Sequence, residues 1–164
     1  MTTTTDMNKT HFTAEAGRQE IWIRREFEAP REKVFAAFTD AKLLKRWLGP
    51  RGYEMIVEEF NPRRGGVYRY LHVDLEGRRH AFRGVVHEVI PNERIVQTFE
   101  YEGWAGNVAL ESFSFEALPE GRTRVVTQSV FPSVETRDRM IESGMEGGVR
   151  DSHERLEEYL REVG

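Results

Sequence analysis

The strongest constraint on the fold is a run of short segments, between residues 53 and 131, in which apolar and polar residues alternate. Side chains of a β-strand point alternately to the two faces of a sheet, so this period of two predicts strands. The strands are expected near residues 53–60, 66–74, 80–90, 93–101, 107–117 and 122–131. Turn residues such as Asn61-Pro62, Gly65-Gly66 and Pro91-Asn92 separate them and suit short antiparallel connections. The centre of the chain is therefore predicted to be an antiparallel sheet.

Helices are predicted on both sides of this run. Residues 20–30 alternate as one more strand and end at Pro30, which suits the first turn of a helix. Residues 31–40 and 41–48 then have apolar side chains at helical spacing. From Ser133 onward a single apolar stripe recurs mostly at steps of three or four: Ile141, Met145, Val149, Leu156, Leu160 and Val163. The expected fold class is α+β, with a curved antiparallel sheet of about seven strands around a long C-terminal helix and two short helices after the first strand.

The length of 164 residues is that of one ordinary domain, and the sequence contains no internal repeat. Residues 1–17 are polar and include a run of threonines, so we expect a disordered N-terminal tail there and a single domain over 18–164. The first residues contain no apolar signal-peptide core, and no apolar run approaches the roughly 18 residues of a membrane span. The sequence thus predicts a cytoplasmic protein without a membrane span.

Composition argues against several functional classes. The formal net charge is −4 and arginines are interleaved with glutamates along the chain, so we do not expect nucleic-acid binding, which needs a clustered positive surface. Cysteine is absent, and the five histidines do not stand at metal-ligand spacings, so no metal and no cofactor are expected. The chain contains no phosphate-binding glycine loop, no G-x-S-x-G and no H-E-x-x-H. An enzyme is therefore possible but is not the favoured class.

Three polar side chains stand on otherwise apolar strand faces. Glu111 shares a face with alanines and phenylalanines, Gln97 with Ile95 and Phe99, and Arg69 with valines and a leucine. A charge on an apolar face must be paired or must line a wet cavity, because burying it alone is costly. Either these residues form structural pairs, such as Arg69 with Glu111, or they are the few polar groups of an apolar pocket.

The stretch RWLGPRG, residues 46–52, places a large aromatic and a leucine at the end of a short helix. Gly49 and Pro50 cannot continue that helix. Trp47 and Leu48 either plug the joint between helix and sheet or border the opening of a cavity. Both interpretations stay open at the level of sequence.

Several short motifs in a fixed order resemble a known superfamily. They are FEAP at 27–30, WLGP at 47–50, PRRGG at 62–66, RGVVHEVIP at 83–91, SGMEGG at 143–148 and ERLEEYL at 154–160. Over about residues 20–162 the chain is similar to the helix-grip superfamily, which includes START lipid-transfer domains and the birch pollen allergen. Within it the chain resembles the bacterial branch related to the C-terminal domain of the heat-shock-protein-90 ATPase activator.

This resemblance implies a seven-stranded antiparallel sheet gripping the C-terminal helix, with an internal cavity between them. Members of the superfamily bind lipids, hormones or polyketides, and some are cyclases or hydrolases. The branch has no shared catalytic motif to transfer to this chain. The eukaryotic activator has a separate N-terminal domain that is not present in these 164 residues, so a direct chaperone link is doubtful.

The favoured hypothesis is a binding protein for a small hydrophobic molecule or lipid, and a homodimer is compatible with it. The candidate ligand-binding residues are Trp47, Leu48, Tyr68, Arg69, Tyr70, Phe82, Gln97, Phe99, Glu111, Phe113 and Met145. One alternative is a cyclase- or hydrolase-like enzyme with Glu111 or His72 as acid–base group, because burial raises the pKa of a carboxyl. The other is a protein-interaction module that uses exposed apolar surface at 47–50.

Overall fold

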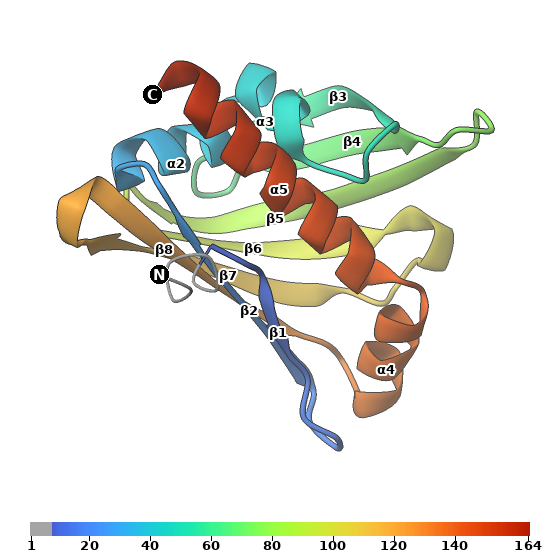
Figure 1. Ribbon diagram of the computed structural model, residues 1–164. Helices are drawn as coiled ribbons and strands as arrows, with labels where there is room; N and C mark the ends of the chain where they lie inside the picture. The colour runs from blue at the N-terminus through green and yellow to red at the C-terminus, as the bar shows by residue number, and fades with distance from the viewer. Residues whose placement is uncertain (1–7) are drawn as a thin grey trace.

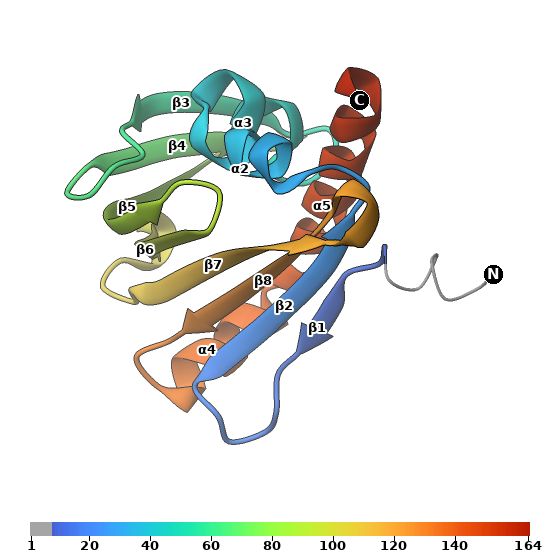
Figure 2. The ribbon, with the colours of Figure 1, turned by 90° about the vertical axis from the view of Figure 1, so that its left-hand side faces the viewer.

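The computed structural model describes residues 8–164 and contains one antiparallel sheet that curls around a helix (Figure 1). Its strands are β1 (His11–Thr13), β2 (Glu20–Phe27), β3 (Glu54–Phe60), β4 (Val67–Val73), β5 (Arg79–Ile90), β6 (Arg94–Tyr101), β7 (Ala109–Leu118) and β8 (Arg122–Val130). Their order across the sheet is β1-β2-β8-β7-β6-β5-β4-β3. The long helix α5 (Met145–Val163) crosses one face, which we call the inner face (Figures 1 and 2).

Two short helices follow β2, as the sequence predicts. They are α2 (Arg31–Thr39) and α3 (Ala41–Trp47), and the carboxylate of Asp40 caps α3 by accepting a hydrogen bond from the backbone N–H of Lys42 at 2.9 Å. The two helices lie at one end of the sheet and α4 (Val134–Glu142) at the other (Figure 2). The predicted α+β helix-grip class is confirmed. Within residues 8–164, no helix is both long and apolar enough to cross a lipid bilayer.

The N-terminal segment differs from its prediction as a disordered tail over 1–17. Residues 8–17 include β1, which pairs antiparallel with β2 and brings the sheet to eight strands instead of about seven. The hydroxyl of Thr10 lies 2.8 Å from Nδ1 of His153 on α5. Edge pairing and this buried contact order a segment whose own composition is polar. Residues 1–7 lie outside the part of the chain that the structure describes.

A buried polar cluster fastens β2 and this segment to α5. Arg25 and Glu157 are both buried, with Nη2 of the guanidinium 3.6 Å from Oε1 of the carboxylate. Nη1 of Arg25 also donates to the hydroxyl of Thr10 at 3.4 Å. Burial, together with the positive charge of Arg25, lowers the pKa of His153 to about 3, so its ring is neutral at pH 7. The cluster is a structural tie between the edge of the sheet and the helix.

The C-terminal stripe forms two helices where the sequence predicts one. Helix α4 ends at Glu142 and α5 begins at Met145, because Gly144 between them adopts the left-handed conformation with φ of +92°. Ser133 caps α4 as expected, accepting a hydrogen bond from the backbone N–H of Thr136 at 3.1 Å. The break lets α4 pack at the end of the sheet while α5 continues across it.

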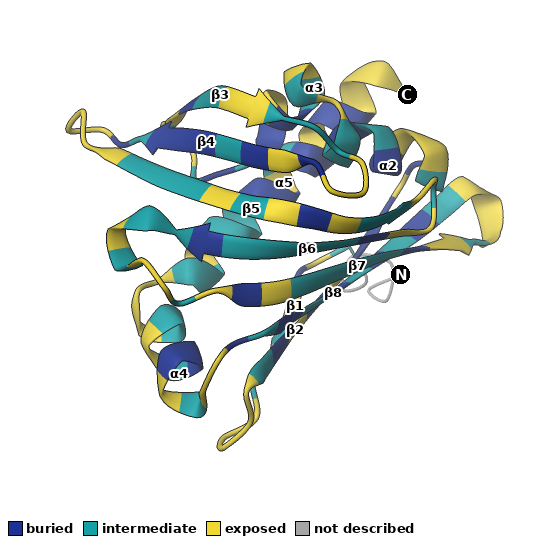
Figure 3. Ribbon diagram, turned by 180° about the vertical axis from the view of Figure 1, so that it is seen from behind, coloured by how far each residue is buried: buried dark blue, intermediate teal, exposed yellow. Residues whose placement is uncertain are grey.

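The interior divides into two apolar clusters. The main cluster joins α2, α3 and the C-terminal half of α5 to the sheet, and includes Phe27, Val34, Trp47, Phe115 and Leu156. The second cluster is smaller and contains Ile21, Ile23, Ala109 and Phe131, with side chains of α4 and of the start of α5 packed against it. Buried and intermediate positions alternate along β8, and Figure 3 shows buried positions on other strands among intermediate and exposed ones.

Candidate functional site

A row of polar side chains crosses the inner face of three neighbouring strands. Gln97 on β6 stands opposite Glu111 on β7, and Glu111 stands opposite Ser129 on β8. Opposite residues in antiparallel strands have Cβ atoms about 4.5–5.5 Å apart, so the three side chains are neighbours. We call Gln97, Glu111 and Ser129 the polar seam. None of the three belongs to either apolar cluster.

The polar seam is poorly satisfied by the protein itself. Nε2 of Gln97 donates to Oε1 of Glu111 at 3.2 Å. Among the described residues, no other hydrogen bond reaches the Glu111 carboxylate, the Gln97 carbonyl or the Ser129 hydroxyl. These oxygens are not fully enclosed, unlike Nδ1 of His72 and the carboxylate oxygens of Glu157, which are enclosed and make no hydrogen bond. Covered polar groups normally find a partner, so the polar seam has capacity to bind something else.

Burial controls the charge of Glu111. Loss of water raises the pKa of its carboxyl to about 7, and the hydrogen bond from Gln97 opposes that shift only in part. The carboxyl is therefore close to half ionised at neutral pH. Burial, and then the charge of Glu111, raises the pKa values of Tyr68 and Tyr70, so both phenols stay protonated.

Stacked aromatic rings form a wall beside the polar seam. Ring centroids lie 6.0 Å apart between Tyr68 and Tyr70, 5.4 Å between Tyr70 and Phe82, and 5.5 Å between Phe82 and Phe99. The interplanar angles are 17°, 25° and 23°, which is the near-parallel stacking that aromatic pairs favour. We call these four residues the aromatic ladder. Phe99 is half-buried, belongs to neither apolar cluster, and stands two residues from Gln97 on the same face of β6.

A narrow crevice of about 20 Å³ leads toward the polar seam from the end of the sheet that holds α2. It is lined by Phe38, Thr39, Phe60, Asn61, Pro62, Tyr68, Val86, Val89, Ile95 and Gln97. This volume is about that of one water molecule. A larger molecule can reach the polar seam by this path only if the side chains at the crevice move apart.

Trp47 and Leu48 do not border this crevice. Trp47 is only 3% exposed, its Nε1 donates to the backbone carbonyl of Ala37 at 3.0 Å, and its ring centroid lies 4.7 Å from that of Phe38. Leu48 is half-buried against the main cluster. The following turn is fixed to α5, where the backbone N–H of Gly49 donates to the hydroxyl of Ser152 at 2.8 Å. The packing interpretation therefore describes RWLGPRG better than the opening of a cavity.

Arg69, a candidate ligand-binding residue, lies on the opposite face from the polar seam, so the pair with Glu111, which was one of the two interpretations, does not form. Its guanidinium forms ion pairs with Glu58 and with Glu102, the latter at 2.7 Å. The tyrosines of β4 point inward instead. Strand β4 carries apolar residues on both faces, so alternation alone did not reveal which face is covered.

The remaining predicted residues lie on the inner side at different depths. Phe113 packs partly buried against the main cluster, and Met145 packs against the second cluster. Ser129 was missed in the sequence because its small hydroxyl does not interrupt an apolar pattern as a charge does. Alternation over 122–130 could have revealed it, since Val125, Thr127 and Ser129 share a face.

Two histidines, His72 and His80, also lie on the inner side of β4 and β5. Burial, followed by the charge of Arg155, lowers the pKa of His72 to about 4, so its ring is neutral at pH 7. His80 lies 2.9 Å from a carboxylate oxygen of Asp74 and 3.1 Å from the hydroxyl of Tyr101. The hydrogen bond from His80 holds the pKa of Asp74 well below its usual range. This second group fixes the turn between β4 and β5.

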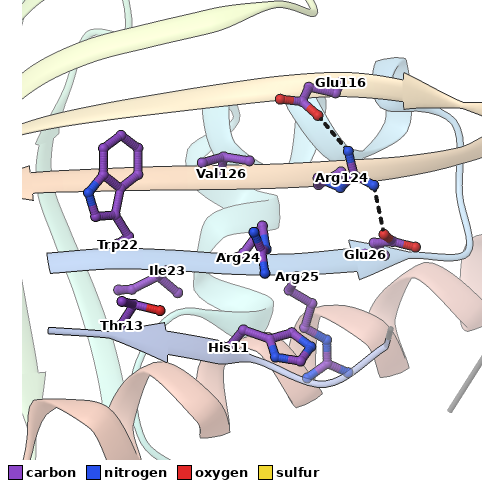
Figure 4. A pocket seen from close by; sticks show the side chains of 10 residues that line it. All are labelled: His11, Thr13, Trp22, Ile23, Arg24, Arg25, Glu26, Glu116, Arg124 and Val126. Carbon is purple, nitrogen blue, oxygen red and sulfur yellow. Dashed lines mark hydrogen bonds and ion pairs between the residues drawn. The ribbon is translucent and has the colours of Figure 1, made fainter. Parts of the chain in front are cut away.

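A hollow of about 810 Å³ lies on the outer face of the sheet beside β1 (Figure 4). It is lined by His11, Thr13, Trp22, Ile23, Arg24, Arg25, Glu26, Glu116, Arg124 and Val126. Arg124 donates to Glu116 at 3.0 Å and to Glu26 at 3.1 Å, as the dashed lines show. The guanidinium of Arg124 and the carboxylates of Glu116 and Glu26 pair with one another on this open surface. We therefore regard the polar seam, whose oxygens have few partners, as the stronger candidate site. Within the described residues, no group of three His, Asp or Glu side chains is placed to hold a metal ion.

Comparison with known proteins is consistent with this architecture. A protein of Rhodobacter sphaeroides shares 26% identity over 93% of this chain and 99% of its own, with a TM-score of 0.84. A solution structure from Arthrobacter aurescens shares 25% identity over 93% of this chain and 91% of its own, with a TM-score of 0.85. A search among curated proteins found no match.

The family model described as "Activator of Hsp90 ATPase homolog 1-like protein" matches residues 28–161. The crystal structure of the AHSA1 protein from Silicibacter pomeroyi has the same fold. It shares 24% identity over 88% of this chain and 99% of its own, with a TM-score of 0.72. Since the family model spans most of the sequence, the chain belongs to the activator of Hsp90 ATPase homolog 1-like family.

Proposed function

We propose that this protein binds a small apolar or amphipathic molecule between the inner face of the sheet and α5. The observation that supports this most is the polar seam, where Glu111 has Gln97 as its hydrogen-bond partner among the described residues and Ser129 has none. A fully buried polar group without a partner costs roughly 1–3 kcal/mol, and the oxygens of the polar seam, which are not fully enclosed, bear less than that. A ligand that hydrogen-bonds to these oxygens would remove that cost.

The chemistry around the polar seam is that of a small-molecule site. Such sites are mostly apolar and aromatic, with a few polar groups that orient the ligand. Here the aromatic ladder would contact the apolar body of the ligand and the polar seam its polar end. The crevice of about 20 Å³ is too small for an organic molecule, so binding would require α2 and the connection between β3 and β4 to move apart.

A chaperone-linked role, which the family description suggests, has less support in this chain. It would be favoured by exposed apolar surface at residues 47–50, whereas Trp47 is 3% exposed and Gly49 is buried against α5. We therefore place ligand binding ahead of chaperone interaction.

The proposal can be tested with two matched substitutions of serine by leucine. Ligands are first found by thermal shift and native mass spectrometry against a panel of lipids, aromatics and polyketides. Calorimetry then compares the wild type with Ser129→Leu, which fills the polar seam, and with Ser112→Leu, which lies one residue from Glu111 on the outer face. Because the leucine fills the site, Ser129→Leu should weaken ligand binding at least about tenfold. The affinity of Ser112→Leu for the same ligand should stay within about twofold of the wild type.

The melting temperature of each variant is the control for folding, because an inserted methylene-rich side chain can strain a packed interior by about 1–3 kcal/mol. Equal losses of affinity in the two variants would contradict the proposed location. The absence of any bound ligand across the whole panel would contradict the proposed function itself.

A further inference from the structure

We infer that the polar seam recognises the ammonium group of an amine whose apolar body lies along the aromatic ladder. This inference rests on the proposed function and names the class of ligand for the same site. It depends on the charge, the hydrogen-bonding capacity and the aromatic surroundings of Glu111.

On the three strands that carry the polar seam, the charge of the inner face has one sign. On the inner faces of the described strands β6, β7 and β8, Glu111 is the one side chain that can carry a formal charge at neutral pH. The arginines of these strands, such as Arg94, Arg122 and Arg124, stand on the outer face and are paired with glutamates there. A carboxylate or phosphate ligand would meet a negative group without a compensating cation, whereas an ammonium group would neutralise it.

The polar seam offers three acceptor oxygens to a ligand, beside the hydroxyl proton of Ser129 and the second N–H of the Gln97 amide as donors. Because Nε2 of Gln97 already donates to Oε1 of Glu111, the polar seam presents Oε2 of Glu111, Oε1 of Gln97 and Oγ of Ser129. An ammonium group has three donors and no acceptor, so its requirements match these three oxygens. A bond between an ammonium and a carboxylate is roughly twice as strong as a neutral one.

The aromatic ladder suits the same ligand. Tyr68 and Tyr70 are buried on the same inner face of the sheet as Glu111, whose charge contributes, after burial, to the raised pKa of both phenols. The faces of aromatic rings attract cations within about 6 Å of the ring centroid, so they would contribute to binding of the amine. Phe82 and Phe99 extend the stack, with centroids 5.5 Å apart, and offer an apolar surface to the rest of the molecule.

The test uses probe molecules that share the same apolar part and differ only in their polar group. Tryptamine, indole-3-ethanol and indole-3-acetate are titrated calorimetrically into the full chain at pH 8, and hexylamine, hexanol and hexanoate form a second series with a slimmer body. We expect at least one amine to bind about tenfold or more tightly than its alcohol, and the acid to bind more weakly than the alcohol.

Glu111→Gln keeps the shape of the side chain and removes its charge, and Glu116→Gln makes the same change on the outer face of the same strand. The first variant should lose the preference for the amine while its affinity for the alcohol stays within about twofold, and the second should behave as wild type.

Equal affinity for amine and alcohol in the wild type, or equal behaviour of the two variants, would overturn the inference. Binding of neither amine would also overturn it. In each of these cases, binding of another member of the ligand panel would still support the proposed function, so the two failures are distinguishable.

Discussion

At the scale of single residues, Glu111 is an ionisable side chain on the covered face of the sheet with one hydrogen bond to offset its loss of water. Burial disfavours its charged form, and Gln97 provides one hydrogen bond of 3.2 Å in return. A glutamine at this position does not ionise, so burial would not act against a charged form. Keeping an ionisable group at this cost to stability is typical of functional sites, where the group interacts with a ligand instead.

The raised pKa of Glu111 makes stability depend on pH in a defined direction. The pKa is about 7 in the folded state against an ordinary value of 4.5, so between these values the folded state binds more protons than the unfolded chain. The free energy of unfolding should therefore fall as pH rises from 4.5 to 7, by up to about 3 kcal/mol from this group. Relative to wild type, Glu111→Gln should gain that stability between pH 5 and 8, as measured by urea denaturation.

The matched control is Glu116→Gln, because Glu116 is exposed on the outer face. Its stability should keep a constant offset from that of the wild type across the same pH range. A constant offset for Glu111→Gln as well would contradict the raised pKa of the Glu111 carboxyl.

Individual site residues could be predicted where a polar side chain interrupted the apolar face of a strand and the other face of that strand was mostly polar. Glu111 and Gln97 were found in this way, and the structure places them opposite one another. Arg69 was assigned to the wrong face because its strand is apolar on both sides. Ser129 was missed because a small hydroxyl interrupts the apolar pattern of its strand less than a charge does, and the assembled sheet places it in a row with Glu111.

At the scale of secondary-structure elements, the period-two pattern located the strands. It could not show that contacts with distant residues order the N-terminal segment, or that the C-terminal helix is divided in two. Strand β1 is short and polar, and it is ordered by pairing with β2 and by the contact between Thr10 and His153. The apolar stripe of the C-terminal region continues through Gly144, so periodicity predicted one helix. The left-handed conformation of Gly144 divides it into α4 and α5.

Two glycines near this break should respond to the same substitution in opposite ways. Gly147 lies inside α5 and an added Cβ would meet nothing within 4 Å, so Gly147→Ala should stabilise the protein by up to about 1 kcal/mol through helix propensity. Gly144 has φ of +92°, so Gly144→Ala should destabilise it by about 1 kcal/mol or more. Urea denaturation of both variants measures the two effects. Shifts of the same sign would contradict the described break between α4 and α5.

At the scale of the whole molecule, the sheet has two faces with different properties. The inner face is covered by α5 and contains a few unpartnered polar oxygens between two apolar clusters. The outer face is open and holds the larger hollow, where Arg124 is paired with two glutamates (Figure 4). The central claim is that the covered face binds the ligand although its visible crevice is the smaller of the two.

Intermolecular nuclear Overhauser effects test this claim most directly, because they report which side chains lie beside a bound molecule. The experiment uses the tightest ligand from the panel, bound to the full chain with its aromatic residues assigned. We predict contacts from ligand protons to the rings of Tyr70 and Phe99, with none to the indole of Trp22, which is 42% exposed on the outer face. Contacts to Trp22 without contacts to the aromatic ladder would contradict the account.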